Sequence, residues 1–157
     1  MISVILSLVT AVWFLLALFL SHQGGAETYE TSIGIAEFLY QFLEDIGFGD
    51  AFTLEMLNLL LRRAAHIILF FVLTLLVCLT LLVLQQERSA RVNPLIGFFF
   101  CLFCCWADEA TKIPIDGRHF AWFDVGLNAA GCAAGGLAFL LIRRFLPGLM
   151  RRHPGQT

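Results

Sequence analysis

The residues of this chain that could do chemistry are polar side chains at the ends of long apolar runs. Arg62, Arg63 and His66 open one run, and their spacing places them on one side of a helix. Asp108 and Glu109 close another run, where the helix dipole disfavours negative charge. An imidazole within an apolar run costs free energy unless another group bonds it. We therefore predict that the two carboxylates pair with Arg62 or Arg63. The alternative is that both arginines reach outward to lipid headgroups and that His66 is a bonded core residue.

A second polar group follows later in the chain. Asp124 and Asn128 share a helix face, and we expect both at the same site. Arg118 follows a glycine turn, where its planar guanidinium could bind a phosphate or carboxylate, or pair with Asp124. Gly131 and Gly135 continue the face of Asn128 at a spacing that lets two membrane helices approach closely. We assign these two glycines to helix packing.

The elements that must position these residues are four apolar stretches. Hydrophobic residues make up 59% of the 157 residues and charged residues only 14%, which is unusual for a soluble domain. A hydrocarbon core of about 30 Å needs about 20 apolar residues, and the stretch before Asp108 is the short one. We expect an all-α membrane protein, a single domain over residues 1–157, with transmembrane helices at about 2–20, 64–84, 92–110 and 124–142.

The arginines near the C-terminus predict the orientation. Arg143, Arg144, Arg151 and Arg152 favour a cytoplasmic C-terminus, because positively charged flanks are retained inside. Four spans then return the N-terminus to the cytoplasm and place the polar residues at the extracytoplasmic face.

The segment between the first and second spans has helical periodicity of its own. We predict a short amphipathic helix on the outer membrane surface, starting after Ser32 as its N-cap and ending at the turn that begins with Gly47. Its apolar face holds Ile35, Phe38, Leu39, Phe42, Leu43 and Ile46. Thr53 is expected to cap a new helix that runs through His66 into the second span.

Neither the cysteines nor the possible metal ligands form a known motif. The five cysteines lie inside apolar runs, and the pair Cys101 and Cys104 is flanked by aromatic residues, so we interpret them as small buried hydrophobic residues. Five other side chains are of metal-binding types, namely His66, Asp108, Glu109, His119 and Asp124. Their spacing matches no metal motif, and we predict no metal and no cofactor.

These motifs together resemble the VanZ family over nearly the whole chain. The resemblance lies in Arg62-Arg63-x-x-His66, Asp108-Glu109, Gly117-Arg118, Asp124, Asn128, Gly131 and the segment Ser21-His22-Gln23-Gly24-Gly25. It implies a small multi-spanning protein of the bacterial cytoplasmic membrane; the founding member lies in a glycopeptide-resistance cluster and is associated with low-level teicoplanin resistance. Two positions differ from the family pattern: Lys112 stands where a glutamine is usual, and Phe70 where a tyrosine is usual.

Three functions fit these residues. We favour a non-enzymatic envelope protein that binds an amphiphile, either a glycopeptide or a lipid-linked cell-wall precursor, among membrane lipids at the extracytoplasmic pocket. The expected ligand-binding residues are Arg62, Arg63, His66, Asp108, Glu109, Arg118, Asp124 and Asn128. The second function is a membrane enzyme acting on a lipid-phosphate or acyl substrate, with His66 or Glu109 as the catalytic group. The third is an ion-coupled transporter. We expect no nucleic-acid partner, and the sequence leaves the oligomeric state open.

Overall fold

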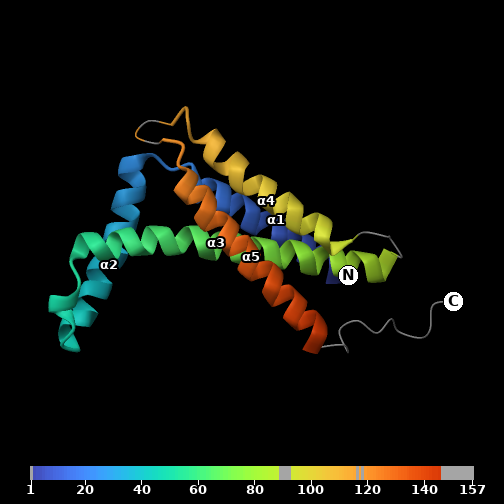
Figure 1. Cartoon of the computed structure of the whole chain (residues 1–157), viewed down its shortest axis with the longest axis horizontal. Helices are drawn as coiled ribbons and strands as arrows, with labels where there is room; N and C mark the ends of the chain where they lie inside the picture. Colours follow the sequence, from blue (N-terminus) through green and yellow to red (C-terminus); the bar gives the residue numbers. More distant parts are fainter. Residues whose placement is uncertain (1, 89–92, 116, 118, 146–157) are drawn as a thin grey trace.

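The computed structural model describes residues 2–88, 93–115, 117 and 119–145. Within them the chain is helical and contains no strand. The elements are α1 (Ile2–Ser21), α2 (Gly25–Asp45), the short 3₁₀ helix η1 (Gly49–Ala51), α3 (Leu54–Arg88), α4 (Pro94–Thr111) and α5 (Trp122–Phe145) (Figure 1).

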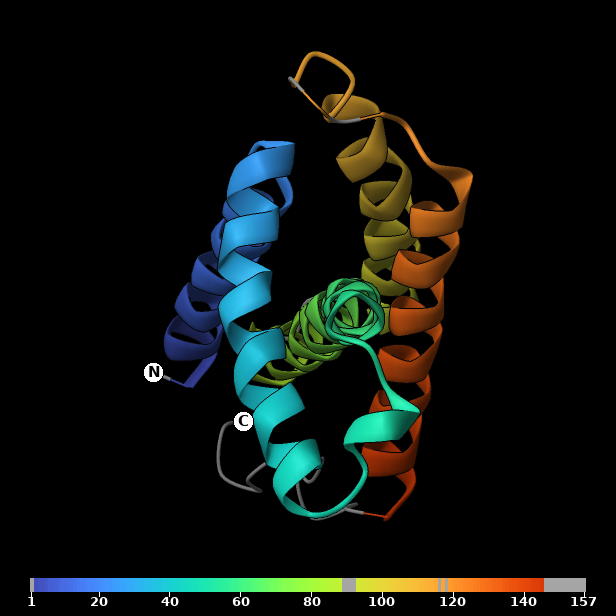
Figure 2. The same cartoon turned by 90° about the vertical axis from the view of Figure 1, so that its left-hand side faces the viewer.

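Helix α3 is the central element. Figure 2 looks along it and shows α1 and α2 on one side and α4 and α5 on the other. Its 35 residues would extend about 52 Å at 1.5 Å per residue, which exceeds a hydrocarbon core of about 30 Å. One end of α3 must therefore project from the core or the helix must tilt.

Among the described residues, three helices are long and apolar enough to cross a membrane: α1, the part of α3 from Leu54 to Gln86, and α5. Most of their residues are not buried inside the protein, which leaves apolar surface for lipid. The chain is therefore a membrane protein. Helix α4 has 18 residues, carries two carboxylates near its C-terminal end, and packs against α3 and α5. Its crossing of the membrane, and with it a total of four spans, stays a prediction.

One end of the bundle contains the C-terminal ends of α1 and α4 together with the start of α5 (Figure 1). His22, just after α1, hydrogen-bonds through Nε2 to the Thr111 hydroxyl at 2.9 Å. The same region contains the polar residues near the starts and ends of the apolar runs. Alternating helix directions thus collect polar groups from distant parts of the sequence at one end.

Helices α3 and α5 cross at the predicted small residues. A Cβ atom at Gly131 would overlap the carbonyl oxygen of Ile67, and one at Gly135 would overlap that of Phe71. Only glycine therefore permits this backbone separation, which sets how deeply the α5 side chains reach toward α3. The five cysteines, which we interpret as small hydrophobic residues, are all buried. Next to the crossing lies a core of Phe70, Leu73, Cys101, Cys104, Cys105 and Cys132.

Helix α2 begins eight residues before the position expected from Ser32 as its cap. The Glu27 carboxylate accepts a hydrogen bond from the Gly24 backbone N–H at 3.3 Å, which stabilises an earlier first turn. The Ser32 hydroxyl instead donates to the Thr28 carbonyl at 2.8 Å within the helix. The predicted start at Ser32 is therefore wrong, because an acidic residue three positions into the helix satisfies an earlier N-terminus.

The end of α2 and the start of α3 agree with the sequence prediction. Helix α2 ends at Asp45, and Gly47 has a φ of 84°, a conformation that favours glycine. The Met56 N–H donates to the Thr53 hydroxyl at 3.2 Å, so Thr53 caps α3. The predicted apolar face of α2 remains largely exposed, with Ile35, Phe38, Phe42 and Ile46 each more than half accessible.

Candidate functional site

Lys112 holds the two carboxylates at the end of α4. Its Nζ lies 3.1 Å from an Asp108 oxygen and contacts Glu109 Oε1, and all three side chains are almost fully buried. Lys112 stands three and four residues after the acids and is the C-cap of α4. A cation there also opposes the negative end of the helix dipole. The expected pairing of these acids with Arg62 or Arg63 is wrong, because the lysine reaches them from one turn along the same helix.

The two arginines of α3 point to different surroundings. The Arg63 guanidinium carbon lies 4.9 Å from the centre of the Phe123 ring, within cation–π range, and Arg63 is exposed. Arg62 is partly buried and lines a pocket. Neither makes an ion pair with a carboxylate in the part of the chain that the structure describes.

Asn128 connects the acids of α4 to His66 of α3. Its Nδ2 donates to Asp108 Oδ2 at 3.4 Å, which fixes the amide orientation because a carboxylate only accepts. Its Oδ1 then accepts from His66 Nδ1 at 2.9 Å. In the neutral imidazole the proton is therefore on Nδ1, and Nε2 keeps a free lone pair. His66 Nε2 lies 3.9 Å from Asp124 Oδ2 at the start of α5.

Glu109 is the most deeply buried acid of this network. Its side chain is essentially inaccessible, and Oε2 has no hydrogen-bond partner among the described residues. Glu109, His66 and Asp124 each offer one ligand atom, and these three atoms lie within 4.8 Å of one another. Three helices thus bring together a histidine and two carboxylates that the sequence separates.

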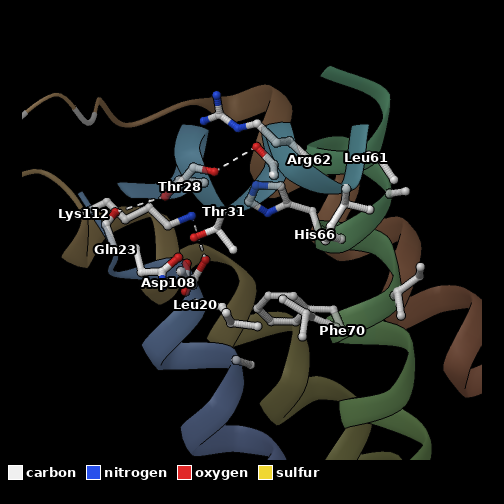
Figure 3. A pocket seen from close by; sticks show the side chains of 18 residues that line it. Leu20, Gln23, Thr28, Thr31, Leu61, Arg62, His66, Phe70, Asp108 and Lys112 are labelled. Carbon is white, nitrogen blue, oxygen red and sulfur yellow. Dashed lines mark hydrogen bonds and ion pairs between the residues drawn. The ribbon is translucent and has the colours of Figure 1, made fainter. Parts of the chain in front are cut away.

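A pocket of about 370 Å³ adjoins this network, between α1, α2, α3 and α4. Its polar side chains gather at one end, where Arg62 and His66 lie across from Lys112 and Asp108 (Figure 3). Leu20 and Phe70 line the opposite end (Figure 3). The wall includes further apolar residues, namely Ala17, Ile35, Leu61, Ala64, Ala65, Ile68 and Leu69.

Two parts of this site were missed by reasoning from the sequence. Lys112 was noticed only as a departure from the family pattern, although its spacing from the acids indicates an intrahelical pair. The α2 residues Thr28, Thr31 and Ser32 line the pocket, but the predicted helix start left the first two outside any element. Their spacing at i, i+3 and i+4 is the signal that could have found them.

The other predicted site residues have different positions. Arg118 lies outside the described residues. Gly131 and Gly135 contact the α3 backbone at positions that follow His66 in α3 and Asn128 in α5.

The fold and this network define an α-helical membrane protein whose buried polar site is assembled by three helices. The model of the VanZ/LLP1 family matches residues 6–143, and the chain belongs to this family. The resemblance drawn from the sequence motifs is thereby confirmed. No curated protein and no solved structure matches the chain.

Proposed function

We propose that this VanZ-family protein binds an anionic amphiphile of the bacterial envelope in the pocket between α1, α2, α3 and α4. The observation that carries the proposal is the distribution of charge along the pocket. Its apolar end suits a hydrocarbon chain, and its polar end contains Arg62, whose guanidinium has no carboxylate partner among the described residues. The other cation of the pocket, Lys112, is already paired with two acids.

The size and position of the pocket support an amphiphilic ligand. Its volume of about 370 Å³ lies within the range of roughly 300–1,000 Å³ for small-molecule sites. Ile35 and Ile68 line it and are each more than half accessible, so we propose that this part of the wall adjoins lipid. A ligand headgroup would meet Arg62 while part of its chain occupies the apolar end.

The other residues predicted to bind ligand have supporting roles in this proposal. Asp108, Glu109 and Asn128 hold Lys112 and His66 in place, and Asp124 approaches His66 from α5. Arg63 lies over the Phe123 ring, and we assign it no contact with the ligand.

The cellular setting follows from the proposal and from the family. We place the protein in the cytoplasmic membrane with four spans, both termini inside and the pocket at the extracytoplasmic face. Its ligand would be a lipid-linked cell-wall precursor, or a glycopeptide that carries a hydrocarbon chain. Expression in a susceptible bacterium would then raise the minimal inhibitory concentration of teicoplanin, and the Arg62→Gln variant would not.

Binding to lipid phosphates tests the proposal directly. Full-length protein in phosphatidylcholine nanodiscs is titrated with undecaprenyl phosphate and with undecaprenol as the uncharged counterpart. We expect Arg62→Gln to weaken phosphate binding at least about tenfold, since a charge-assisted hydrogen bond contributes about 1.5–3 kcal/mol. Binding of undecaprenol should change little.

Arg63→Gln is the matched control, because Arg63 neighbours Arg62 in sequence but lies over Phe123. A second variant, Ala65→Phe, fills the pocket wall and should reduce binding of both lipids, whereas Ala130→Phe on the exposed surface of α5 should not. Equal binding by wild type, Arg62→Gln and Ala65→Phe would overturn the proposed pocket.

A further inference from the structure

We propose that His66, Glu109 and Asp124 form a binding site for a divalent transition-metal cation such as Zn²⁺. Their three ligand atoms lie within 4.8 Å of one another and come from α3, α4 and α5. One imidazole nitrogen and two carboxylates are ligand types that zinc and related metals accept. This site is separate from the proposed pocket ligand and does not depend on it.

The free oxygen of Glu109 is an independent sign of a missing partner. A carboxylate that is wholly buried should have its oxygens bonded, because an unsatisfied polar group costs free energy in a low-dielectric environment. Lys112 bonds Oε1, but Oε2 has no hydrogen-bond partner among the described residues. A cation next to this oxygen would remove the deficit.

The surroundings of His66 prepare its other nitrogen for a metal. Asn128 Oδ1 accepts the Nδ1 proton at 2.9 Å, and Asp108 Oδ2 in turn orients the Asn128 amide. This leaves the Nε2 lone pair on the side of Asp124, 3.9 Å from Oδ2. Metal-binding histidines commonly donate their second N–H to an oxygen in this way, which fixes the tautomer and the ring orientation.

The charge balance at the site also favours a divalent cation. Asp108, Glu109 and Asp124 supply three carboxylates near the single ammonium of Lys112, an excess of two negative charges. A divalent cation would neutralise this excess in a largely buried environment. The Asp124 side chain is 32% accessible, so a cation can enter from the start of α5.

Binding requires a small contraction of the three side chains. With zinc–ligand bonds of about 2.0–2.2 Å, tetrahedral ligand atoms are about 3.3–3.6 Å apart, so the distances between the three ligand atoms, now within 4.8 Å, would shorten by up to about 1.5 Å. Three protein ligands leave a coordination position for water or for a ligand oxygen. Because His66 also lines the pocket, a headgroup oxygen could occupy that position.

Metal titration of the full-length protein tests the site. The detergent-solubilised protein is stripped with chelator, titrated with Zn²⁺ by calorimetry, and checked for stoichiometry by elemental analysis. We expect one Zn²⁺ per chain in the wild type. His66→Gln and Asp124→Asn should each reduce affinity at least tenfold, and Asn128→Leu by about 10–100-fold through the loss of ring orientation.

Two variants control for weak surface binding. His119→Gln and Asp45→Asn remove an exposed histidine and an exposed carboxylate away from the three ligands, and both should bind Zn²⁺ like the wild type. Substitution with Co²⁺ should give visible absorption bands that disappear in His66→Gln. If the folded wild type binds no Zn²⁺, or if His66→Gln and Asp124→Asn bind as it does, the three residues form no metal site and the inference fails.

Discussion

At the scale of single residues, Lys112 determines how two carboxylates can lie buried at the end of α4. Its ammonium contacts both Asp108 and Glu109, and each of the three side chains is nearly inaccessible. Each charge would be costly alone at this depth, so the three depend on one another. The neutral amide of a glutamine at this position would donate to one carboxylate but would not neutralise it.

Removal of the ammonium should therefore destabilise the fold. We expect Lys112→Met to lower the free energy of unfolding by about 3–5 kcal/mol, because it leaves buried carboxylates without a cation. Lys112→Gln should cost less, since it keeps a hydrogen-bond donor. Thermal unfolding in detergent, followed by circular dichroism, measures both.

A double variant separates charge from packing. If charge is the cause, the combination of Lys112→Met with Glu109→Gln should recover part of the stability lost in Lys112→Met. No recovery would mean that the lysine stem, rather than its ammonium, stabilises this end of α4.

The sequence indicated the members of this network better than their pairing. Polar residues at the ends of apolar runs were correctly expected at one end of the bundle, because alternating spans place those ends together. The partner of the acids was predicted wrongly, because Arg62 and Arg63 lie on another helix, whereas Lys112 lies one turn away on α4 and reaches both carboxylates. The bond between His66 and Asn128 depends on the rotation of α3 against α5, which spacing along one helix does not specify.

At the scale of elements, the crossing of α3 and α5 sets the position of the polar network. Gly131 lies against the carbonyl of Ile67. Ile67 directly follows His66 in α3, and Gly131 lies one helical turn after Asn128 in α5. Any side chain there would move α5 away from α3. The separation of His66 and Asn128 therefore depends on a residue that has no polar side chain of its own.

An alanine at this crossing should be harmful although it is small. We expect Gly131→Ala to lower the free energy of unfolding by about 1–3 kcal/mol through overpacking. Gly126→Ala, on the same helix with open space around its Cβ, should be neutral or stabilising by up to about 1 kcal/mol, owing to helix propensity. The apparent melting temperatures of the two variants provide the comparison, and similar values would argue against close backbone contact.

The boundaries of elements were predictable where a single residue caps a helix. Thr53 and the turn at Gly47 were read correctly, because each satisfies or ends a helix locally. The start of α2 was not, since its first two turns are polar on the face toward the pocket and lack the apolar periodicity that indicates a helix. The polar residues of α2 that line the pocket are thus the ones that apolar periodicity does not indicate.

At the scale of the whole molecule, the polar site and the arginines in the last turn of α5 lie at opposite ends of that helix. Arg143 and Arg144 are exposed in the last turn of α5, while His66, Asp108 and Asp124 gather near its start. A positive flank at one end and a polar pocket at the other predict the orientation of the bundle across the membrane.

Reporter fusions test that direction. We expect alkaline phosphatase fused after Ile113 to be active, because this position would lie outside, and green fluorescent protein fused at the C-terminus to fluoresce in the cytoplasm. The two fusions should report opposite sides of the membrane in the same strain. The same side for both would contradict a crossing by α5 in the proposed orientation.

The exposed residues Ile35 and Ile68 on the pocket wall have a consequence for how a ligand arrives. An amphiphile already dissolved in the bilayer can enter by lateral diffusion, without passing through water. Occupancy would then follow the mole fraction of that amphiphile among the surrounding phospholipids, which compete for the same opening. A scarce lipid can occupy such a site only if its headgroup gains more there than the abundant lipids do.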